Sequence, residues 1–280
     1  MTTRAWAIAV AGSDGHQWQL LARLPAQPRA ALLWLPALGV AARHYEAFAD
    51  ALAAEGVAVL VHEWRGNGSS NRRASRQCDW GYREILALDL PASQRALQEV
   101  AGELPLLIGG HSLGGQLACC HAGQQPGIFS RLWLVASGTP GWHSFPAPLR
   151  YALPPAYRFA RWLARRNGTL PGRRVGFGGT EARGLIADWA QVGLSNRYAA
   201  SGWDVDLEAG MARTRAPIDA LVMARDWMAP VTSMRALAAK IGGPCRLEIL
   251  DASELGTRAD HFSWLKTPAK VAHRLAMAVR

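Results

Sequence analysis

Lysine and acidic residues are scarce in this 280-residue chain. Lys occurs only at positions 240, 266 and 270, so arginine dominates the 31 basic residues, which face 21 acidic ones at a formal net charge of +10. Such an excess can indicate contact with nucleic acid or an anionic membrane. No helix-turn-helix, zinc-finger or RNA-binding motif accompanies it, so we expect no nucleic-acid partner and interpret most of the charge as solvated surface.

Long hydrophobic runs and cysteine motifs are also missing. No apolar run approaches the ~20 residues of a membrane-spanning helix. Among four cysteines, Cys119 and Cys120 are adjacent on a predicted buried helix, which favours free thiols in a reducing cytoplasm over a disulfide framework. No C-x-x-C or His/Cys spacing predicts a metal site, and we expect no cofactor. Turn residues follow the first apolar run, which we interpret as a strand and not a secretion signal.

Short apolar runs alternate with longer helical patterns along most of the chain. Continuous apolar strands separated by helices predict an α/β fold, with a mostly parallel central β-sheet and helices on both faces. The turn at Gly12–Gly15 predicts an antiparallel edge hairpin from the first two runs. Strands are predicted over residues 5–10, 16–22, 30–35, 57–62, 104–109, 131–136, 217–223 and 245–250. Helices are predicted over residues 43–55, 82–101, 113–123, 233–241 and 262–279.

The alternation stops between residues 140 and 216. This segment is rich in aromatic residues, and from Trp142 to Thr180 it contains seven arginines and no acidic residue. Its position after the sixth strand favours a helical lid, so we predict a cap of residues 140–216 on a core of residues 1–139 and 217–280. Ordinary surface helices packed on the sheet are the alternative.

One amphipathic helix is predicted inside this cap, from Pro155 to Arg166, with a proline in its first turn. Arginines are expected on one face of it and apolar residues on the other: Arg158, Arg161 and Arg165 against Ala156, Phe159, Ala160 and Leu163.

The sequence Gly110-His111-Ser112-Leu113-Gly114 has the pattern G-x-S-x-G between a predicted strand and a predicted helix. A strand-to-helix turn this tight strains the central residue and exposes its side chain, which is typical of a nucleophile elbow. A Cβ atom at Gly110 or Gly114 would collide with the neighbouring strand or helix, so glycine is expected at both positions. His111 lies between Gly110 and Ser112 in the same turn. We predict Ser112 as a nucleophile.

A serine nucleophile needs a histidine base and a carboxylate that orients it, and after such a turn the acid precedes the histidine along the chain. His261 lies in a loop before the last predicted helix, whereas His273 falls inside that helix, so we predict His261 as the base. The sixth strand ends without a carboxylate, and the next one leads to Asp226. We therefore predict Asp226 as the acid, with Asp251 and Asp260 as competitors.

An oxyanion hole also needs two backbone N–H groups directed at the developing charge. Leu113, directly after the serine, is predicted to supply one. The loop Pro36-Ala37-Leu38-Gly39 follows the strand over residues 30–35, and we predict Leu38 as the second donor.

With these motifs the chain resembles the α/β-hydrolase superfamily over nearly its whole length. The segments that resemble its conserved loops are Glu63-Trp64-Arg65-Gly66-Asn67-Gly68-Ser69-Ser70, Asp226-x-x-x-Pro230 and Asp260-His261-Phe262. More narrowly, the chain resembles bacterial predicted hydrolases related to the serine aminopeptidase S33 group. The segments with that likeness are Pro36-Ala37-Leu38-Gly39-Val40, Leu88-Asp89-Leu90-Pro91-Ala92, Gly109 to Gln116 and Pro171 to Gly178. The usual His-Gly before the oxyanion residue is Pro36-Ala37 here, and Glu63 replaces an Asp.

Cleavage of a carboxylic ester is the reaction that these residues predict, with a small-molecule ester or acyl compound as substrate. Epoxide or haloalkane hydrolysis would need Asp at position 112. An S33-like aminopeptidase, an acyltransferase or thioesterase, and a non-catalytic binding protein on the same fold stay open as alternatives. The arginines and aromatic residues of the predicted cap also leave transient contact with a lipid surface open. The sequence does not predict an oligomeric state.

Overall fold

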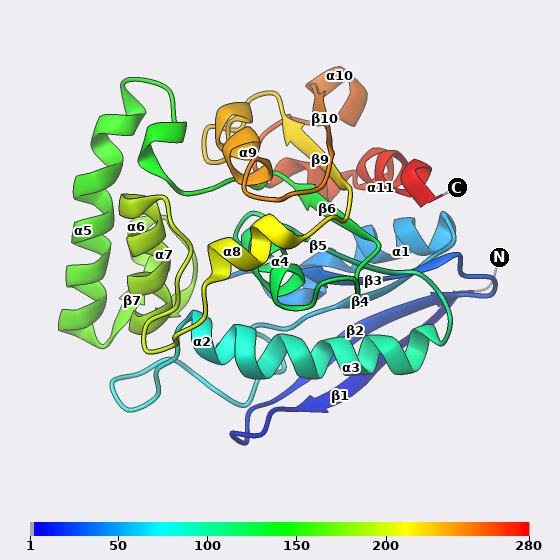
Figure 1. Cartoon of the computed structure of the whole chain (residues 1–280), viewed down its shortest axis with the longest axis horizontal. Helices are drawn as coiled ribbons and strands as arrows, with labels where there is room; N and C mark the ends of the chain where they lie inside the picture. Colours follow the sequence, from blue (N-terminus) through cyan, green and yellow to red (C-terminus); the bar gives the residue numbers. More distant parts are fainter. Residues whose placement is uncertain (1–2, 280) are drawn as a thin grey trace.

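The computed structural model describes residues 3–279, apart from the side chain of Val175. Residues 1, 2 and 280 of the predicted core lie outside this range. Within it, the central sheet has eight strands in the order β1-β2-β4-β3-β5-β6-β9-β10 (Figure 1). β2 pairs antiparallel with β1 and β4, and the other pairs are parallel.

The strands are β1 (Thr3–Ala11), β2 (Gln17–Pro25), β3 (Ala30–Leu35), β4 (Val57–Val61), β5 (Leu106–His111), β6 (Arg131–Val135), β9 (Ile218–Met223) and β10 (Cys245–Leu250), with a separate antiparallel pair β7 (Thr169–Pro171) and β8 (Thr180–Ala182). The α-helices are α1 (Glu46–Ala54), α2 (Tyr82–Glu84), α3 (Leu90–Ala101), α4 (Leu113–Gln124), α5 (Leu149–Asn167), α6 (Gly172–Val175), α7 (Arg183–Ser195), α8 (Leu207–Arg213), α9 (Val231–Ala238), α10 (Ala252–Leu255) and α11 (Ala269–Ala276). Shorter turns are the 3-10 helices η1 (Ala42–Tyr45), η3 (Trp142–Ser144), η4 (Ser263–Lys266) and η5 (Met277–Val279) and the π-helix η2 (Ile85–Asp89).

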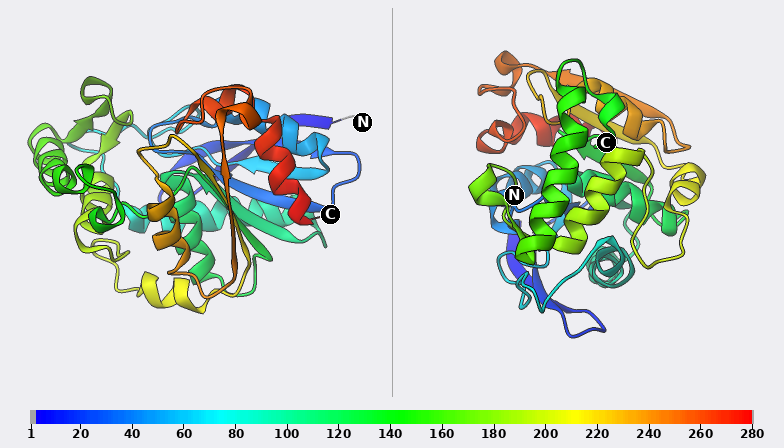
Figure 2. Two further views of the ribbon diagram at one scale, coloured as in Figure 1. Left: turned by 90° about the horizontal axis from the view of Figure 1, so that it is seen from above. Right: turned by 90° about the vertical axis from the view of Figure 1, so that its left-hand side faces the viewer.

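Strand β3 shows why this sheet is covered on both faces. Successive side chains of a strand point to opposite faces, and every residue of β3 is buried. Leu33 and Leu35 lie in the core that α3 and α4 cover, whereas Leu32 and Trp34 lie in the core that α1 and α11 cover. The two helical layers on either side of the sheet are visible in Figure 2. The predicted α/β fold with a mostly parallel sheet is confirmed.

Two predicted helices differ from the structure by more than three residues at one end. The helix predicted from Pro155 begins at Leu149, and Pro154 and Pro155 lie inside it. A proline ring already holds the helical φ, so the first turns of α5 extend past both prolines although their N–H bonds are lost. The helix predicted over residues 262–279 is interrupted at Thr267 and Pro268, between η4 and α11. Phe159, predicted on the packed face of α5, is 55% exposed.

The chain between β6 and β9 forms the group of elements at the left of Figure 1. α5 packs on α7, and Tyr157 lies edge-on against Trp189 with ring centroids 4.9 Å apart. α8 leaves this group and packs on α4 so closely that a Cβ atom at Gly123 would lie 2.6 Å from the Met211 nitrogen. The role of this segment as a lid stays a prediction.

A buried ion pair ties the loop after β4 to the rest of the core. Asp89 has no exposed surface, and its carboxylate accepts two hydrogen bonds from Arg65, at 2.7 and 2.8 Å. His16 contacts the same carboxylate at 3.0 Å and the Ser70 hydroxyl at 2.9 Å. Arg65 also donates to Asp14 at 2.8 Å. These contacts join the β1–β2 turn, the loop after β4 and the π-helix.

Asp89→Ala is expected to lower the free energy of unfolding by about 3–5 kcal/mol, because it leaves the Arg65 guanidinium buried without its main partner. Urea unfolding followed by circular dichroism measures this loss. Asp50→Ala is the matched control, since the Asp50–Arg23 pair is solvent-exposed on the Asp50 side and should contribute less than about 1 kcal/mol. Equal losses for the two variants would contradict this account.

Candidate active site

Ser112 lies at the turn between β5 and α4 in a strained backbone conformation. Its φ of 56° and ψ of −121° are unusual for a residue with a side chain. The glycines around it are required by close backbone contacts. A Cβ atom at Gly110 would lie 2.3 Å from the carbonyl carbon of Gly114, and one at Gly114 would lie 2.0 Å from the Leu35 oxygen. The turn therefore tolerates no side chain at either position.

Asp226 and His261 are hydrogen-bonded to each other beyond the carboxyl ends of β9 and β10. The His261 Nδ1 atom lies 2.7 Å from the Asp226 carboxylate, and both side chains are buried. The second carboxylate oxygen of Asp226 accepts the N–H groups of Met228 and Ala229, each at 2.9 Å. These two bonds fix the carboxylate, which in turn fixes the imidazole ring.

The second ring nitrogen of His261 is the unsatisfied atom of this pair. Nε2 is buried and has no hydrogen-bond partner within residues 3–279. A carboxylate only accepts hydrogen bonds, so Nδ1 carries the proton of the neutral ring and Nε2 is left as an acceptor. The His261 ring lies beside His111, with centroids 4.9 Å apart, so it is next to the residue that precedes Ser112.

The competing candidates have other partners. His273, on α11, contacts the Glu55 carboxylate at 2.9 Å. Asp260 accepts the N–H groups of Phe262 and Ser263 at the start of η4. Asp251 caps the N-terminus of α10. The structure pairs Asp226 with His261. His273, Asp260 and Asp251 are instead bonded to other partners.

Leu38 and Leu113 meet at one small cavity. Its volume is about 10 Å³, and its lining also includes Gly39, Leu117 and the Glu181 side chain. Leu113 is the first residue of α4, so its N–H has no acceptor within the helix. Within the described chain the N–H of Leu38 also takes part in no hydrogen bond. Leu38 and Leu113, the residues of the two predicted donors, thus line the same cavity, and their role as donors stays a prediction.

Sequence reasoning missed Tyr45, which links the loop of Leu38 to the turn of Ser112. The Ala37 N–H donates to the Tyr45 hydroxyl at 2.9 Å, and that oxygen lies 2.8 Å from His111 Nδ1. The hydroxyl therefore bridges the Ala37 N–H and the His111 ring, and it donates its own proton to Nδ1 when the other ring nitrogen, Nε2, carries the imidazole proton. Burial lowers the pKa of His111 well below its ordinary value and raises that of Tyr45, so both side chains are neutral. No spacing pattern in the sequence signals this contact.

Glu181 is the middle residue of β8, directly after the stretch of the predicted cap that lacks acidic residues. Its side chain is buried beside Leu38, and its carboxylate accepts the Gly179 N–H at 2.6 Å. Burial raises the pKa of Glu181. A buried acid in this cavity is a feature that only the folded chain reveals.

Among residues 3–279, no group of three or more His, Cys, Asp and Glu side chains is arranged to hold a metal ion. No helix in this part of the chain is both long enough and apolar enough to cross a membrane.

Comparisons with known proteins agree with this architecture. A family profile described as "Serine aminopeptidase, S33" matches residues 26–191. A search of the curated proteins finds no match. Among solved structures, a hydrolase from Pseudomonas aeruginosa PA01 has a TM-score of 0.65 at 20% identity over 97% of each chain. The esterase domain of a Rhodothermus marinus protein has a TM-score of 0.63 at 17% identity, over 99% of this chain and 98% of that one.

A third structure is Est1E from Butyrivibrio proteoclasticus with ferulic acid bound, with a TM-score of 0.62 at 15% identity over 96% of this chain and 98% of that one. At these identities the three structures establish a common fold. The family profile covers more than half of the chain, and the sheet order and the turn at Ser112 agree with it. The chain is therefore an α/β hydrolase and belongs to the serine aminopeptidase S33 family.

Proposed function

We propose that this protein is a serine hydrolase that cleaves a carboxylic ester. The observation that carries the proposal is the buried His261–Asp226 hydrogen bond, which leaves His261 Nε2 as a free acceptor beside the turn of Ser112. A histidine held in this tautomer is suited to remove the proton of a serine hydroxyl. The names of two structural neighbours, an esterase domain and Est1E, agree with ester chemistry.

In the proposed reaction, Ser112 Oγ attacks the acyl carbon while its proton passes to His261 Nε2. Asp226 stabilises the imidazolium that forms, and the Leu38 and Leu113 N–H groups bind the oxyanion. His261 then gives its proton to the leaving alcohol as the ester bond breaks. In the second half, water gives a proton to His261 and attacks the acyl carbon of the acyl-enzyme. The bond from this carbon to Ser112 Oγ then breaks, His261 returns the proton to Oγ, and the carboxylic acid is released.

The Tyr45 contacts support a role in positioning Leu38. The Ala37 N–H precedes Leu38 by one residue, and Tyr45 holds it against His111, the neighbour of Ser112. The distance between the Leu38 N–H group and Ser112 therefore depends on the buried Tyr45 hydroxyl. We infer that Tyr45 is a positioning residue, which touches no substrate itself.

The S33 family name also suggests aminopeptidase activity as an alternative function. Glu181 is the observation that favours it, because a carboxylate at this cavity can hold a substrate ammonium group. Two features weigh against that function. Burial raises the pKa of Glu181, which favours its neutral form, and its carboxylate already accepts the Gly179 N–H. Ester cleavage needs no such group, and we prefer it.

Ser112→Ala is expected to abolish hydrolysis of p-nitrophenyl esters, and Asp226→Asn to lower kcat by about 10⁴-fold because the histidine then takes the wrong tautomer. Initial rates over acyl lengths from acetate to palmitate test both changes. Ser130→Ala and His273→Ala are matched controls away from the site and should keep full activity. Undiminished hydrolysis by Ser112→Ala would refute the proposed nucleophile.

Tyr45→Phe is expected to lower kcat about tenfold with little change in KM, because a loosened Leu38 N–H weakens binding of the oxyanion and not of the ester. Steady-state kinetics separates the two parameters. Tyr82→Phe is the control, since the buried Tyr82 hydroxyl has no hydrogen-bond partner within the described residues. A rise in KM at constant kcat would argue against positioning.

Glu181→Gln distinguishes ester cleavage from aminopeptidase activity. If the protein is an esterase, the variant should hydrolyse p-nitrophenyl butyrate within about threefold of the wild-type rate, because no substrate charge is held there. An aminopeptidase would instead cleave aminoacyl p-nitroanilides and lose that activity in the variant. Efficient wild-type cleavage of the anilides, with none of the esters, would replace the esterase proposal.

A further inference from the structure

The outer side of α5 carries a stripe of exposed aromatic side chains. Tyr151 is 67% exposed, and Phe159 and Trp162 are each 55% exposed. Their spacing of eight and three residues places them within about a quarter of the helix circumference. The Phe159 and Trp162 rings are stacked with centroids 5.7 Å apart. Large aromatic side chains exposed together on one helix face are unusual for a surface that contacts only water.

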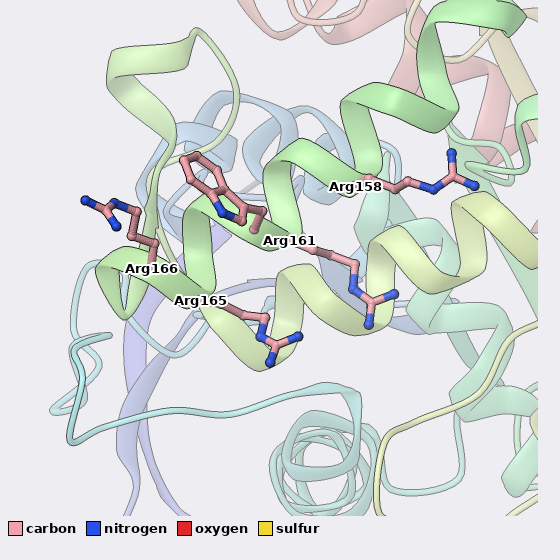
Figure 3. A pocket seen from close by; sticks show the side chains of 5 residues that line it. Arg158, Arg161, Arg165 and Arg166 are labelled. Carbon is pink, nitrogen blue, oxygen red and sulfur yellow. The ribbon is translucent and has the colours of Figure 1, made fainter.

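Arginines border this stripe. Arg158, Arg161 and Arg165 lie along one side of it, and Arg166 extends on the opposite side from Arg161 and Arg165 (Figure 3). Within the described residues, none of the four forms an ion pair with a carboxylate. Arg161 donates to the neutral Gln191 side chain on α7. Their positive charge is therefore free to attract an anionic partner.

The charge around α5 is uniform over a long stretch of chain. From Trp142 to Thr180 there are seven arginines and no acidic residue, while the protein as a whole has 21 acidic residues. Two of those arginines, Arg173 and Arg174, are exposed on α6, the next helix along the chain. The basic surface thus extends beyond α5.

The length of α5 and the residue types on its exposed face distinguish between anionic partners. α5 has 19 residues, so it is about 28 Å long. It lies along the outside of the molecule, with α7 behind it (Figure 2). Trp162 and the four arginines line an open, shallow pocket of about 680 Å³ on this face. Exposed aromatic residues with arginines beside them match a headgroup layer, where the rings enter the boundary of the acyl chains and the guanidinium groups bind phosphates.

We propose that the exposed face of α5 docks on an anionic lipid surface. The arginines supply attraction to the headgroups, and Phe159 and Trp162 supply apolar contact. Neither set suffices alone, because arginines bind any polyanion and the aromatic residues would not select anionic lipid. Binding that needs both sets therefore identifies the partner. The inference does not depend on the proposed esterase activity.

Sedimentation of the full chain with vesicles tests the proposal. Binding is expected to vesicles of phosphatidylcholine and phosphatidylglycerol at 4:1, to be much weaker with phosphatidylcholine alone, and to fall at 0.5 M NaCl. Arg158→Glu with Arg165→Glu should lower the partition coefficient at least 25-fold, at about fivefold for each lost charge. Phe159→Ala with Trp162→Ala should lower it about tenfold or more.

Matched controls distinguish a loss of folding from a loss of docking. Arg95→Glu on α3 changes an exposed arginine and Ile249→Ala on β10 changes an exposed large apolar residue elsewhere, and both should leave partitioning unchanged. Each variant is accepted only with a wild-type circular dichroism spectrum and melting temperature. If the α5 variants bind as wild type does, or if Arg95→Glu weakens binding as strongly, the proposal is overturned.

A polyanion site without lipid specificity gives a different result. In that case the arginine variant would lose binding to vesicles and duplex DNA alike, and the aromatic variant would retain both. That outcome would replace the lipid surface by a nucleic acid or another polyanion as the partner. Absence of binding to anionic vesicles at low salt would also overturn the proposal.

Discussion

The close approach of the backbone around Ser112 is the constraint on which the site depends. β5 meets α4 so tightly that Gly110 and Gly114 leave no room for a Cβ atom, and Ser112 takes a positive φ between them. The same approach brings the first turn of α4 against the Leu35 and Pro36 carbonyl groups. The strand that ends there continues into the loop of Leu38. One steric constraint thus sets the positions of the serine and of both proposed oxyanion donors.

The parts of the fold that could be predicted are those with a local signal. The five central strands, β3, β4, β5, β6 and β9, appear in the sequence as short, mostly apolar runs because both of their faces are buried. β1, β2 and β10, at or next to the edges of the sheet, are partly exposed, and polar residues interrupt the runs of β2 and β10. The beginning of α5 was predicted six residues late, because the proline pair was interpreted as a helix start. The strands β7 and β8 have three residues each, too few for a pattern. Local chemistry predicts elements well and their ends less well.

Tyr45 and Glu181 illustrate what no local signal predicts. Each acts through a neighbour far away in sequence or in a separate element, the His111 ring for Tyr45 and the Leu38 loop for Glu181. A second cluster of Ser, His and Asp shows that these residue types can also be in contact without forming a candidate active site. Ser70, His16 and Asp89 are in contact, as nucleophile, base and acid would be, yet all three are buried and Arg65 occupies the carboxylate. Ser70 is buried, whereas Ser112 is partly exposed. Exposure of the serine and competing partners of the acid, which the sequence does not contain, separate this structural cluster from the candidate site.

The distribution of charge explains why a net charge of +10 had no clear meaning in the sequence alone. In the core, several basic groups are paired with carboxylates, as in Arg65–Asp89, Arg131–Asp219 and Lys240–Glu208. Each of these pairs joins one positive and one negative group, so it contributes no net charge. Within residues 3–279, Arg158, Arg161, Arg165 and Arg166 on α5 form no ion pair with a carboxylate, and the field they produce extends about a Debye length into solvent, roughly 8–10 Å at physiological salt. Part of the excess positive charge is therefore concentrated on one helix face, and a partner of opposite charge would be attracted to that face.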